Sequence, residues 1–136
     1  MKQTLNKDEI EFFYNLLYKY EHESHAGYQD KKVLKAIGNN IIIDDKHEKN
    51  EIISIEKTNC LQFTPYHNCK CWAILYHVRN SFAHGNIQSI EKDTTFLIRD
   101  YSDKGKRTKC NMLGIVKKSN FYELIDAIEK TKKTKR

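Results

Sequence analysis

Residues 77–86 read His77-Val78-Arg79-Asn80-Ser81-Phe82-Ala83-His84-Gly85-Asn86. Upstream of this stretch, the only proline of the chain, Pro65, marks a break, and Asn68 is a suitable N-terminal cap for a helix. Apolar residues then recur at helical spacing, at Cys71, Ile74, Leu75 and Val78. We therefore predict a helix that begins near Asn68, continues into the quoted stretch and ends near Gly85.

Three further helices are predicted around this one. Asn6 and Glu9 have the spacing of a capping box, in which each residue satisfies the other's backbone N–H at a helix start. Gly38 follows a short apolar period and is typical of a helix end. A serine cap begins the last helix. The expected helices cover residues 7–24, residues 29–37, and the chain from Ser119 onward.

Two stretches after the central helix are typical of β-structure. Residues 95–99 and 108–116 are strand-like, and residues 102–105 between them are turn-like, so a β-hairpin is predicted. The β-branched runs within residues 39–60 allow either short strands or a helix, and we expect irregular structure plus one helix there. The predicted fold class is mainly α, with the hairpin between the central helix and the C-terminal helix.

Length and composition narrow the class of protein. A chain of 136 residues with 39% hydrophobic residues is the size of one domain, which we place at residues 1–128. No apolar run approaches the roughly 18 residues of a membrane span. The first six residues lack the apolar stretch of a secretory signal. We therefore expect a cytoplasmic globular protein that has no membrane partner.

Much of the net charge of +6 lies at the C-terminus. Residues 129–136 hold five basic residues and one acidic residue, whereas the rest of the chain is nearly balanced. Such a basic tail can attract phosphates, or it can serve solubility alone. The candidate RNA-binding residues of the tail are Lys130, Lys132, Lys133, Lys135 and Arg136.

The four cysteines are expected to be free thiols, because no secretion signal places them in an oxidising compartment. His67, Cys69 and Cys71 lie close enough in sequence to suggest zinc. The usual zinc pairing separates two cysteines by two residues, however, and here the separation is one. Cys71 also falls at an apolar position of the predicted helix. We therefore predict no metal site and no cofactor.

Arg79 and His84 could together cleave RNA without a metal. Histidine side chains exchange protons near neutral pH, and an arginine fork binds phosphate and its developing negative charge. Asn80 could orient the histidine or contact the phosphate, and the 2′-hydroxyl of RNA would supply the nucleophile. A straight helix would separate Arg79 and His84 by about 140°, so a helix end or a second copy of the chain has to bring such groups together.

The string Arg79-Asn80-x-x-Ala83-His84-Gly85-Asn86 resembles the signature of the HEPN superfamily (higher eukaryotes and prokaryotes nucleotide-binding), in which many members read RN-x-x-AHG. The specific match covers about ten residues. The predicted order of helices, hairpin and closing helix is also similar to small stand-alone and plasmid-encoded members of that superfamily. The resemblance implies an up-and-down α-helical bundle.

The resemblance also implies an activity and partners. Many members of the superfamily are metal-independent endoribonucleases that act as toxins of toxin–antitoxin pairs or in phage defence, and they commonly form homodimers with a composite active site. Carried onto this sequence, Arg79 and His84 are the expected catalytic residues, and Asn80 is the supporting polar residue. RNA, a second copy of the chain and an antitoxin protein are the partners implied.

Two alternatives stay open from the sequence. One is a catalytically inactive HEPN module that binds RNA, a nucleotide or a partner protein through Arg79. The other is a structural protein in which the motif only builds a dimer interface. His77 could border the same cleft as an RNA-binding residue, or it could be a surface histidine of the helix, and Ser81 has no evident partners for nucleophilic catalysis.

Overall fold

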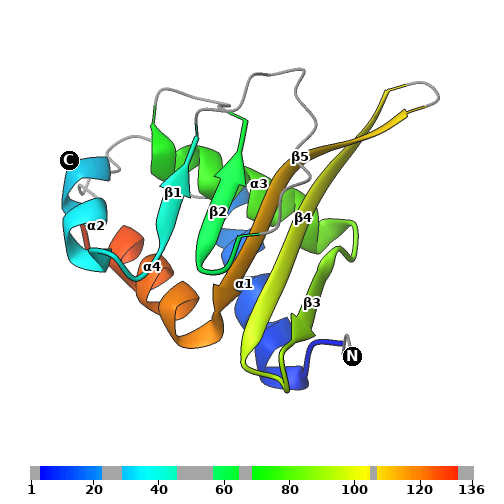
Figure 1. Ribbon diagram of the computed structural model, residues 1–136, viewed down its shortest axis with the longest axis horizontal. Coiled ribbons are helices and arrows are strands. Elements are labelled where there is room, and N and C mark those ends of the chain that lie inside the picture. The colour runs from blue at the N-terminus through cyan, green and yellow to red at the C-terminus, as the bar shows by residue number, and fades with distance from the viewer. Residues whose placement is uncertain (1–3, 23–28, 46–56, 65–68, 105–106, 132–136) are drawn as a thin grey trace.

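The computed structural model describes residues 4–22, 29–45, 57–64, 69–104 and 107–131 (Figure 1). Within these ranges the chain forms four helices and five strands. The helices are α1 (Lys7–His22), α2 (Asp30–Ile37), α3 (Lys70–Ala83) and α4 (Lys118–Thr131). The strands are β1 (Ile42–Asp44), β2 (Cys60–Phe63), β3 (Ile87–Ile90), β4 (Thr95–Lys104) and β5 (Arg107–Lys117).

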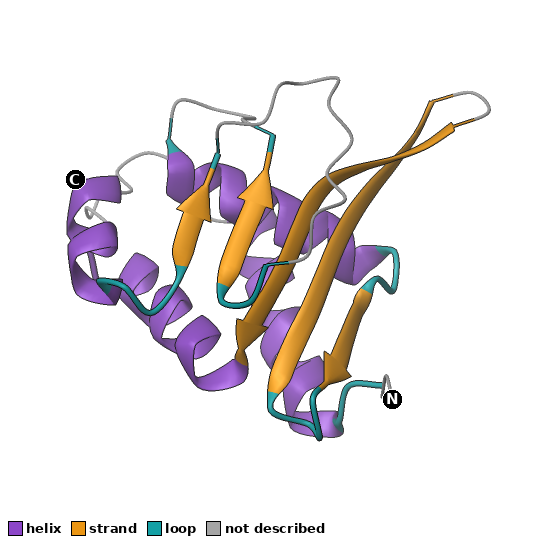
Figure 2. Ribbon diagram, in the orientation of Figure 1, coloured by secondary structure: helices purple, strands orange, loops and turns teal. Residues whose placement is uncertain are grey.

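The strands form a single mixed sheet in the order β1-β2-β5-β4-β3. β1 pairs with β2 in parallel, and the other neighbours are antiparallel. The helices gather on one side of the sheet, with α3 and α1 behind β4 and β5 and with α2 and α4 toward the β1 edge (Figures 1 and 2). The molecule therefore has a layer of helices on a layer of strands.

The predicted fold class is wrong: the protein is a mixed α/β structure and not a mainly α helical bundle. The hairpin expected between the central and C-terminal helices is present as β4 and β5, but these two longest described strands lie inside a five-stranded sheet. The irregular structure and helix expected in residues 39–60 are replaced, where the structure describes them, by β1 and the start of β2. Residues 46–56 lie outside the described ranges.

The hairpin strands can occupy the centre of the sheet because both of their faces are apolar. Phe96 and Ile98 of β4 point to the helices and belong to the main core, whereas Leu97 between them belongs to a smaller cluster on the other face. The same alternation in β5 directs Val116 to the helices and Ile115 to the other face. An exposed hairpin would leave one of these faces in water.

The start of α1 confirms the predicted capping box. The backbone N–H of Asn6 donates to Glu9 Oε1 at 3.0 Å, and the backbone N–H of Glu9 donates to Asn6 Oδ1 at 2.9 Å. Phe13 and Leu16 of α1 are buried, whereas Ile10 is 46% exposed. α1 therefore presents part of its apolar surface to solvent.

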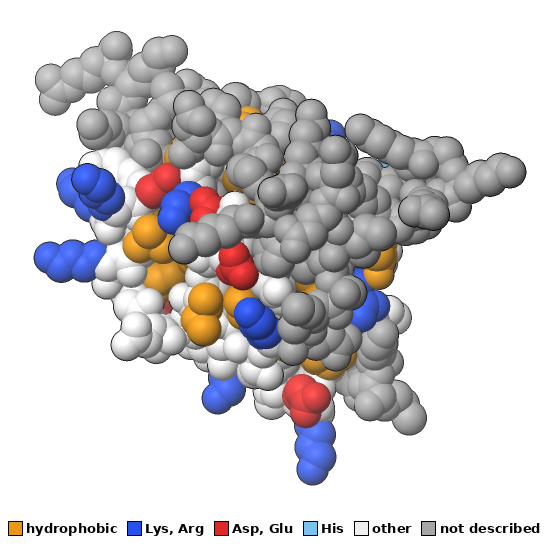
Figure 3. Space-filling view, turned by 45° about the horizontal axis from the view of Figure 1, so that its top comes forward, with side chains coloured by type: hydrophobic (Ala, Val, Ile, Leu, Met, Phe, Trp, Pro, Cys, Tyr) orange, Lys and Arg blue, Asp and Glu red, His pale blue; other side chains and the backbone are white. Residues whose placement is uncertain are grey.

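The described basic side chains do not gather into one stripe on the face that Figure 3 draws. Lysine and arginine side chains stand apart there, with acidic side chains among them. A protein that tracks a nucleic-acid backbone through charge alone would concentrate its basic groups. Any nucleic-acid contact on the described part of this face would depend on individual residues.

Lys118, at the start of α4, contacts both α1 and the β3–β4 turn. Its ammonium contacts Glu9 of α1 and Asp93 of the β3–β4 turn, the latter at 2.6 Å, and lies 5.2 Å from the centre of the Phe96 ring. Burial opposes the charged form of Lys118, but hydrogen bonds to Asp93 and Glu9 outweigh it and raise its pKa. The Glu9 side chain is only 6% exposed, and Lys118 is its buried counter-ion.

Replacement of Lys118 by methionine is expected to lower the free energy of unfolding by about 3 kcal/mol, because the buried carboxylate of Glu9 would lose its counter-charge. The matched control is Lys117→Met, at an exposed neighbour, which should change stability by less than about 0.5 kcal/mol. Urea denaturation of both variants measures the difference. Equal stabilities would show that the Lys118 cluster contributes nothing.

Candidate functional site

The stretch that resembles the HEPN signature lies at the C-terminal end of α3, where the helix leaves the core. His84 is the C-cap residue, and its backbone N–H donates to the Asn80 carbonyl at 3.1 Å. The N–H of Gly85 then donates to Phe82 O at 3.0 Å, and the N–H of Asn86 donates to Ser81 O at 2.7 Å. These two bonds form a Schellman motif, for which Gly85 supplies the required positive φ of 72°.

Arg79 and Asn80 form a pair on the last turns of α3. The Nη1 atom of Arg79 donates to Asn80 Oδ1 at 2.7 Å. The Arg79 guanidinium also lies 6.0 Å from the centre of the Tyr20 ring of α1, at the outer limit of a cation–π contact. Tyr20 is in turn stacked on Trp72, with ring centres 4.4 Å apart. The guanidinium is therefore half-buried against an aromatic cluster that joins α1 to α3.

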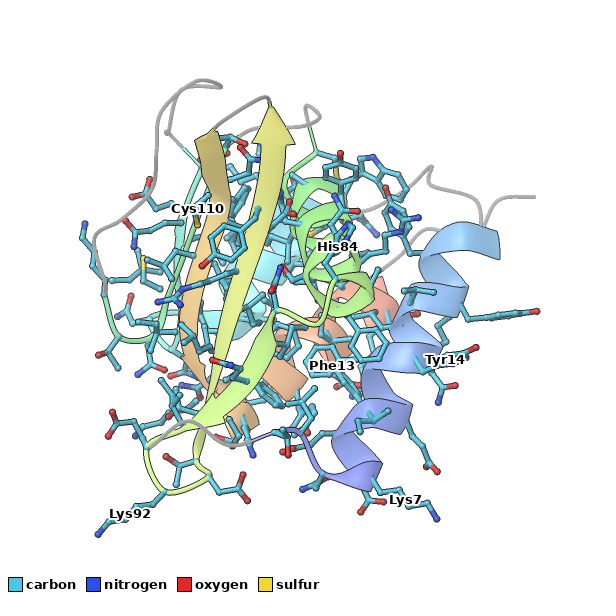
Figure 4. The ribbon with its side chains drawn as sticks, turned by 90° about the vertical axis from the view of Figure 1, so that its right-hand side faces the viewer. Lys7, Phe13, Tyr14, His84, Lys92 and Cys110 are labelled. Atoms are coloured by element: carbon cyan, nitrogen blue, oxygen red, sulfur yellow. The ribbon has the colours of Figure 1, made fainter. Side chains whose placement is uncertain are left out.

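His84 is exposed just beyond the end of α3 (Figure 4). In the described part of the chain its ring makes no hydrogen bond or ion pair, so no such contact joins it to Arg79 or Asn80. The structure thus brings Arg79 and Asn80 together and places His84 nearby in sequence on the same helix end. The three residues could act on one phosphate only if a ligand bridged them or a second copy completed the site.

His77 lies in the interior, although the sequence analysis proposed it either as an RNA-binding residue at the cleft or as a surface histidine. It is 2% exposed, and both of its ring nitrogens have partners: Nδ1 lies 2.6 Å from Asp100 Oδ2, and Nε2 lies 2.9 Å from the Thr64 carbonyl oxygen. Ser81, also buried, donates its hydroxyl to the His77 carbonyl at 2.8 Å and not to an imidazole. Neither side chain faces a surface at which RNA could bind.

The basic tail begins inside a helix. α4 continues to Thr131, and the exposed ammonium of Lys130 pairs with Asp126 at 2.8 Å, a contact that raises the pKa of Lys130. Lys132, Lys133, Lys135 and Arg136 lie outside the described residues. Of the tail residues predicted to bind RNA, only Lys130 therefore has a described position.

The described cysteines are free thiols. Among the residues that the structure describes, no group of three or more metal-binding side chains is found, and His67 lies outside them. Burial raises the pKa of Cys71, with a further contribution from Asp30, and burial likewise raises the pKa of Cys69. Both thiols therefore resist the ionisation that metal binding requires.

Asp30 is a positioning residue that the sequence analysis missed. It begins α2, yet its carboxylate caps the start of α3: it accepts from the N–H groups of Lys70 at 2.7 Å and Cys71 at 3.0 Å, and from the Cys69 thiol at 3.2 Å. Partial burial opposes ionisation, but these donors outweigh it and lower the pKa of Asp30. No local signal reveals a cap supplied from 40 residues away.

Comparison of the chain with protein-family models, with curated proteins and with solved structures finds no match. No helix within the described ranges is both long enough and apolar enough to cross a membrane.

Replacement of Asp30 by alanine is expected to lower the free energy of unfolding by about 1–2 kcal/mol at neutral pH, through loss of the α3 cap. Because the folded-state pKa is lowered, this contribution is present above the ordinary carboxyl value of about 3.9 and is lost as the pH falls through the lower folded value. The measurement is urea denaturation of wild type and variant between pH 7 and pH 2. A constant difference across that range would contradict the assignment.

Proposed function

We propose that the protein is a metal-independent endoribonuclease whose site is the end of α3. The observation that carries the proposal is the arrangement there: Arg79 and Asn80 are paired at 2.7 Å, and the exposed ring of His84 follows where the helix ends. The resemblance of residues 79–86 to the HEPN signature supports the same residues. The proposal rests on this local site and not on the fold, which is not the helical bundle of that superfamily.

The reaction would use the 2′-hydroxyl of RNA as the nucleophile. The His84 ring accepts the proton of that hydroxyl, the 2′-oxygen bonds to phosphorus, and the bond from phosphorus to the 5′-oxygen breaks. The products are a 2′,3′-cyclic phosphate and a 5′-hydroxyl, whose proton comes from a second imidazole. The Arg79 fork, held by Asn80, would stabilise the charge that develops on the phosphoryl oxygens.

A second copy of the chain is the proposed source of the second imidazole. The exposed face of α1 supports such an assembly, because Ile10, Tyr14 and Tyr18 recur every four residues and are 46%, 63% and 57% exposed. Tyr14 lies on the outer side of α1 in Figure 4. Burial of these side chains against a second copy would remove apolar area from water. The same proposal includes a role as a toxin or phage-defence effector that an antitoxin protein binds and inhibits.

Single substitutions at the α3 end are expected to slow RNA cleavage strongly in excess EDTA. His84→Ala removes the proton-transfer group and should lower the rate by about 100-fold or more. Arg79→Lys keeps the charge but loses the planar fork, so it should also be strongly impaired. The assay is gel analysis of labelled RNA, with an all-DNA strand of the same sequence as a substrate that lacks the 2′-hydroxyl.

The matched control is Lys92→Ala, at an exposed residue of the β3–β4 turn far from the site (Figure 4), which should cleave as wild type does. Melting temperatures of all variants separate loss of chemistry from loss of fold. Wild-type cleavage by His84→Ala would exclude this site. Tight RNA binding without any product, even by wild type, would instead favour the inactive binding module.

Tyr14→Glu is expected to convert a dimer into a monomer, because it places a charge at the centre of the exposed α1 face. The measurement is light scattering coupled to size-exclusion chromatography, with Lys92→Ala, which lowers the net charge by the same one unit elsewhere on the surface, as the control. A wild-type monomer at micromolar concentration, or a dimer that Tyr14→Glu leaves intact, would contradict an α1 interface.

A further inference from the structure

His77 joins α3 to two strands of the sheet at once. Its Nδ1 atom faces Asp100 Oδ2 of β4 at 2.6 Å, and its Nε2 atom faces the backbone oxygen of Thr64, the residue after β2, at 2.9 Å. The side chains of His77 and Asp100 are 3% and 5% exposed. The rings of Phe63 and Tyr76 flank the imidazole at 5.8 and 5.3 Å. Water therefore has little access to this contact.

The two partners determine where the protons of this pair lie. A backbone carbonyl can only accept, so Nε2 of His77 has to carry a proton. One further proton has to lie between Nδ1 and the carboxylate, since a bare nitrogen lone pair 2.6 Å from a carboxylate oxygen would be repelled. Imidazole is more basic than a carboxylate by about two to three pH units in water, and here an acceptor oxygen faces each of the two ring nitrogens.

We infer that His77 is a buried imidazolium, ion-paired with Asp100, and that it is the positioning residue of α3. It precedes Arg79 by two residues, so its two directional bonds fix both the rotation and the height of the helix end over the sheet. Apolar packing alone would allow α3 to rotate or slide, whereas a paired buried charge has one favourable geometry. The consequence for RNA cleavage rests on the proposed function, but the protonation and the anchoring do not.

The charged and titratable groups around the pair do not supply an alternative partner. Tyr76 contributes a ring edge from α3, and Cys110 of β5 is near enough to Asp100 for that carboxylate to help raise the thiol pKa, after burial as the main cause. Arg99 neighbours Asp100 along β4 and acts on Cys110 in the opposite sense. The only described group in hydrogen-bond contact with the Asp100 side chain is His77.

The first test is NMR of the ¹⁵N-labelled full chain at pH 7.5. Wild type should show two ring N–H signals for His77, both slow to exchange with water and both absent from His77→Gln, whereas His84→Ala should retain them. Asp100→Asn keeps the shape of the pair but lets the amide donate to Nδ1, so only one ring N–H should remain. A single ring proton in wild type would overturn the imidazolium.

The second test uses the double variant His77→Phe/Asp100→Leu, which removes both charges and replaces them with apolar side chains. It should melt at a higher temperature than His77→Phe alone, which leaves Asp100 buried without a partner. If His77 positions α3, the backbone amide signals of residues 79–84 will move in the folded double variant, whereas those of α2 will not. Unchanged signals for residues 79–84 would overturn the positioning role.

RNA cleavage separates this inference from the proposed function. In the folded double variant we expect kcat to fall at least about 10-fold, because Arg79 and His84 would be displaced from the arrangement that acts on the phosphate. Wild-type kcat in the double variant would contradict positioning. Wild type could show two His77 ring protons, and the double variant could show displaced signals for residues 79–84, in a protein that never cleaves RNA. That result would support His77 as the positioning residue and refute the proposed ribonuclease activity.

Discussion

The structure depends on the burial of α3 against the sheet. Residues 71–75 of this helix are all buried, as are His77, Val78 and Ser81, so the helix has little surface left for water. Every polar group that it takes into the core therefore needs a partner there. Asp30 satisfies its first N–H groups, Asp100 and the Thr64 carbonyl satisfy the His77 ring, and the Gly85 turn satisfies its last carbonyls. These contacts fix the helix from start to end, and its motif is fixed with it.

Features that depend on residues close together in the sequence could be predicted from the sequence alone. The capping box of Asn6 and Glu9, the glycine that ends α2 at Gly38 and the hairpin of β4 and β5 were each encoded within about 20 residues, and each is present. α1 and α2 begin within one residue of their predicted starts. Short-range hydrogen bonds and glycine conformations impose such features whatever the rest of the chain does.

The assembly of the sheet could not be predicted in the same way. β1 and β3 are three and four residues long, and their pairing with β2 and β4 is decided by contacts across the sheet. A short β-branched run such as Ile41-Ile42-Ile43 has no period that separates a buried strand from other structure. The burial of Asp100, in contrast, could have been predicted from the sequence, because Asp100 continues the inward-facing positions of Phe96 and Ile98 along β4. A carboxylate at a core position calls for a buried partner.

The residues of the HEPN-like stretch fall into two groups. Val78 is core, Ser81 bonds to the helix backbone, and Gly85 supplies the positive φ of the terminal turn, so folding alone explains these three. The His84 ring is different, because the turn uses only its backbone and the described core does not contact its side chain. Arg79 and Asn80 pair with each other on the last turns of α3, and the Arg79 guanidinium also lies 6.0 Å from the Tyr20 ring of α1, so both side chains have partners in the fold. Folding thus accounts for the motif's framework and gives Arg79 and Asn80 partners within it, and among the described contacts only the exposed His84 ring is left without a structural role.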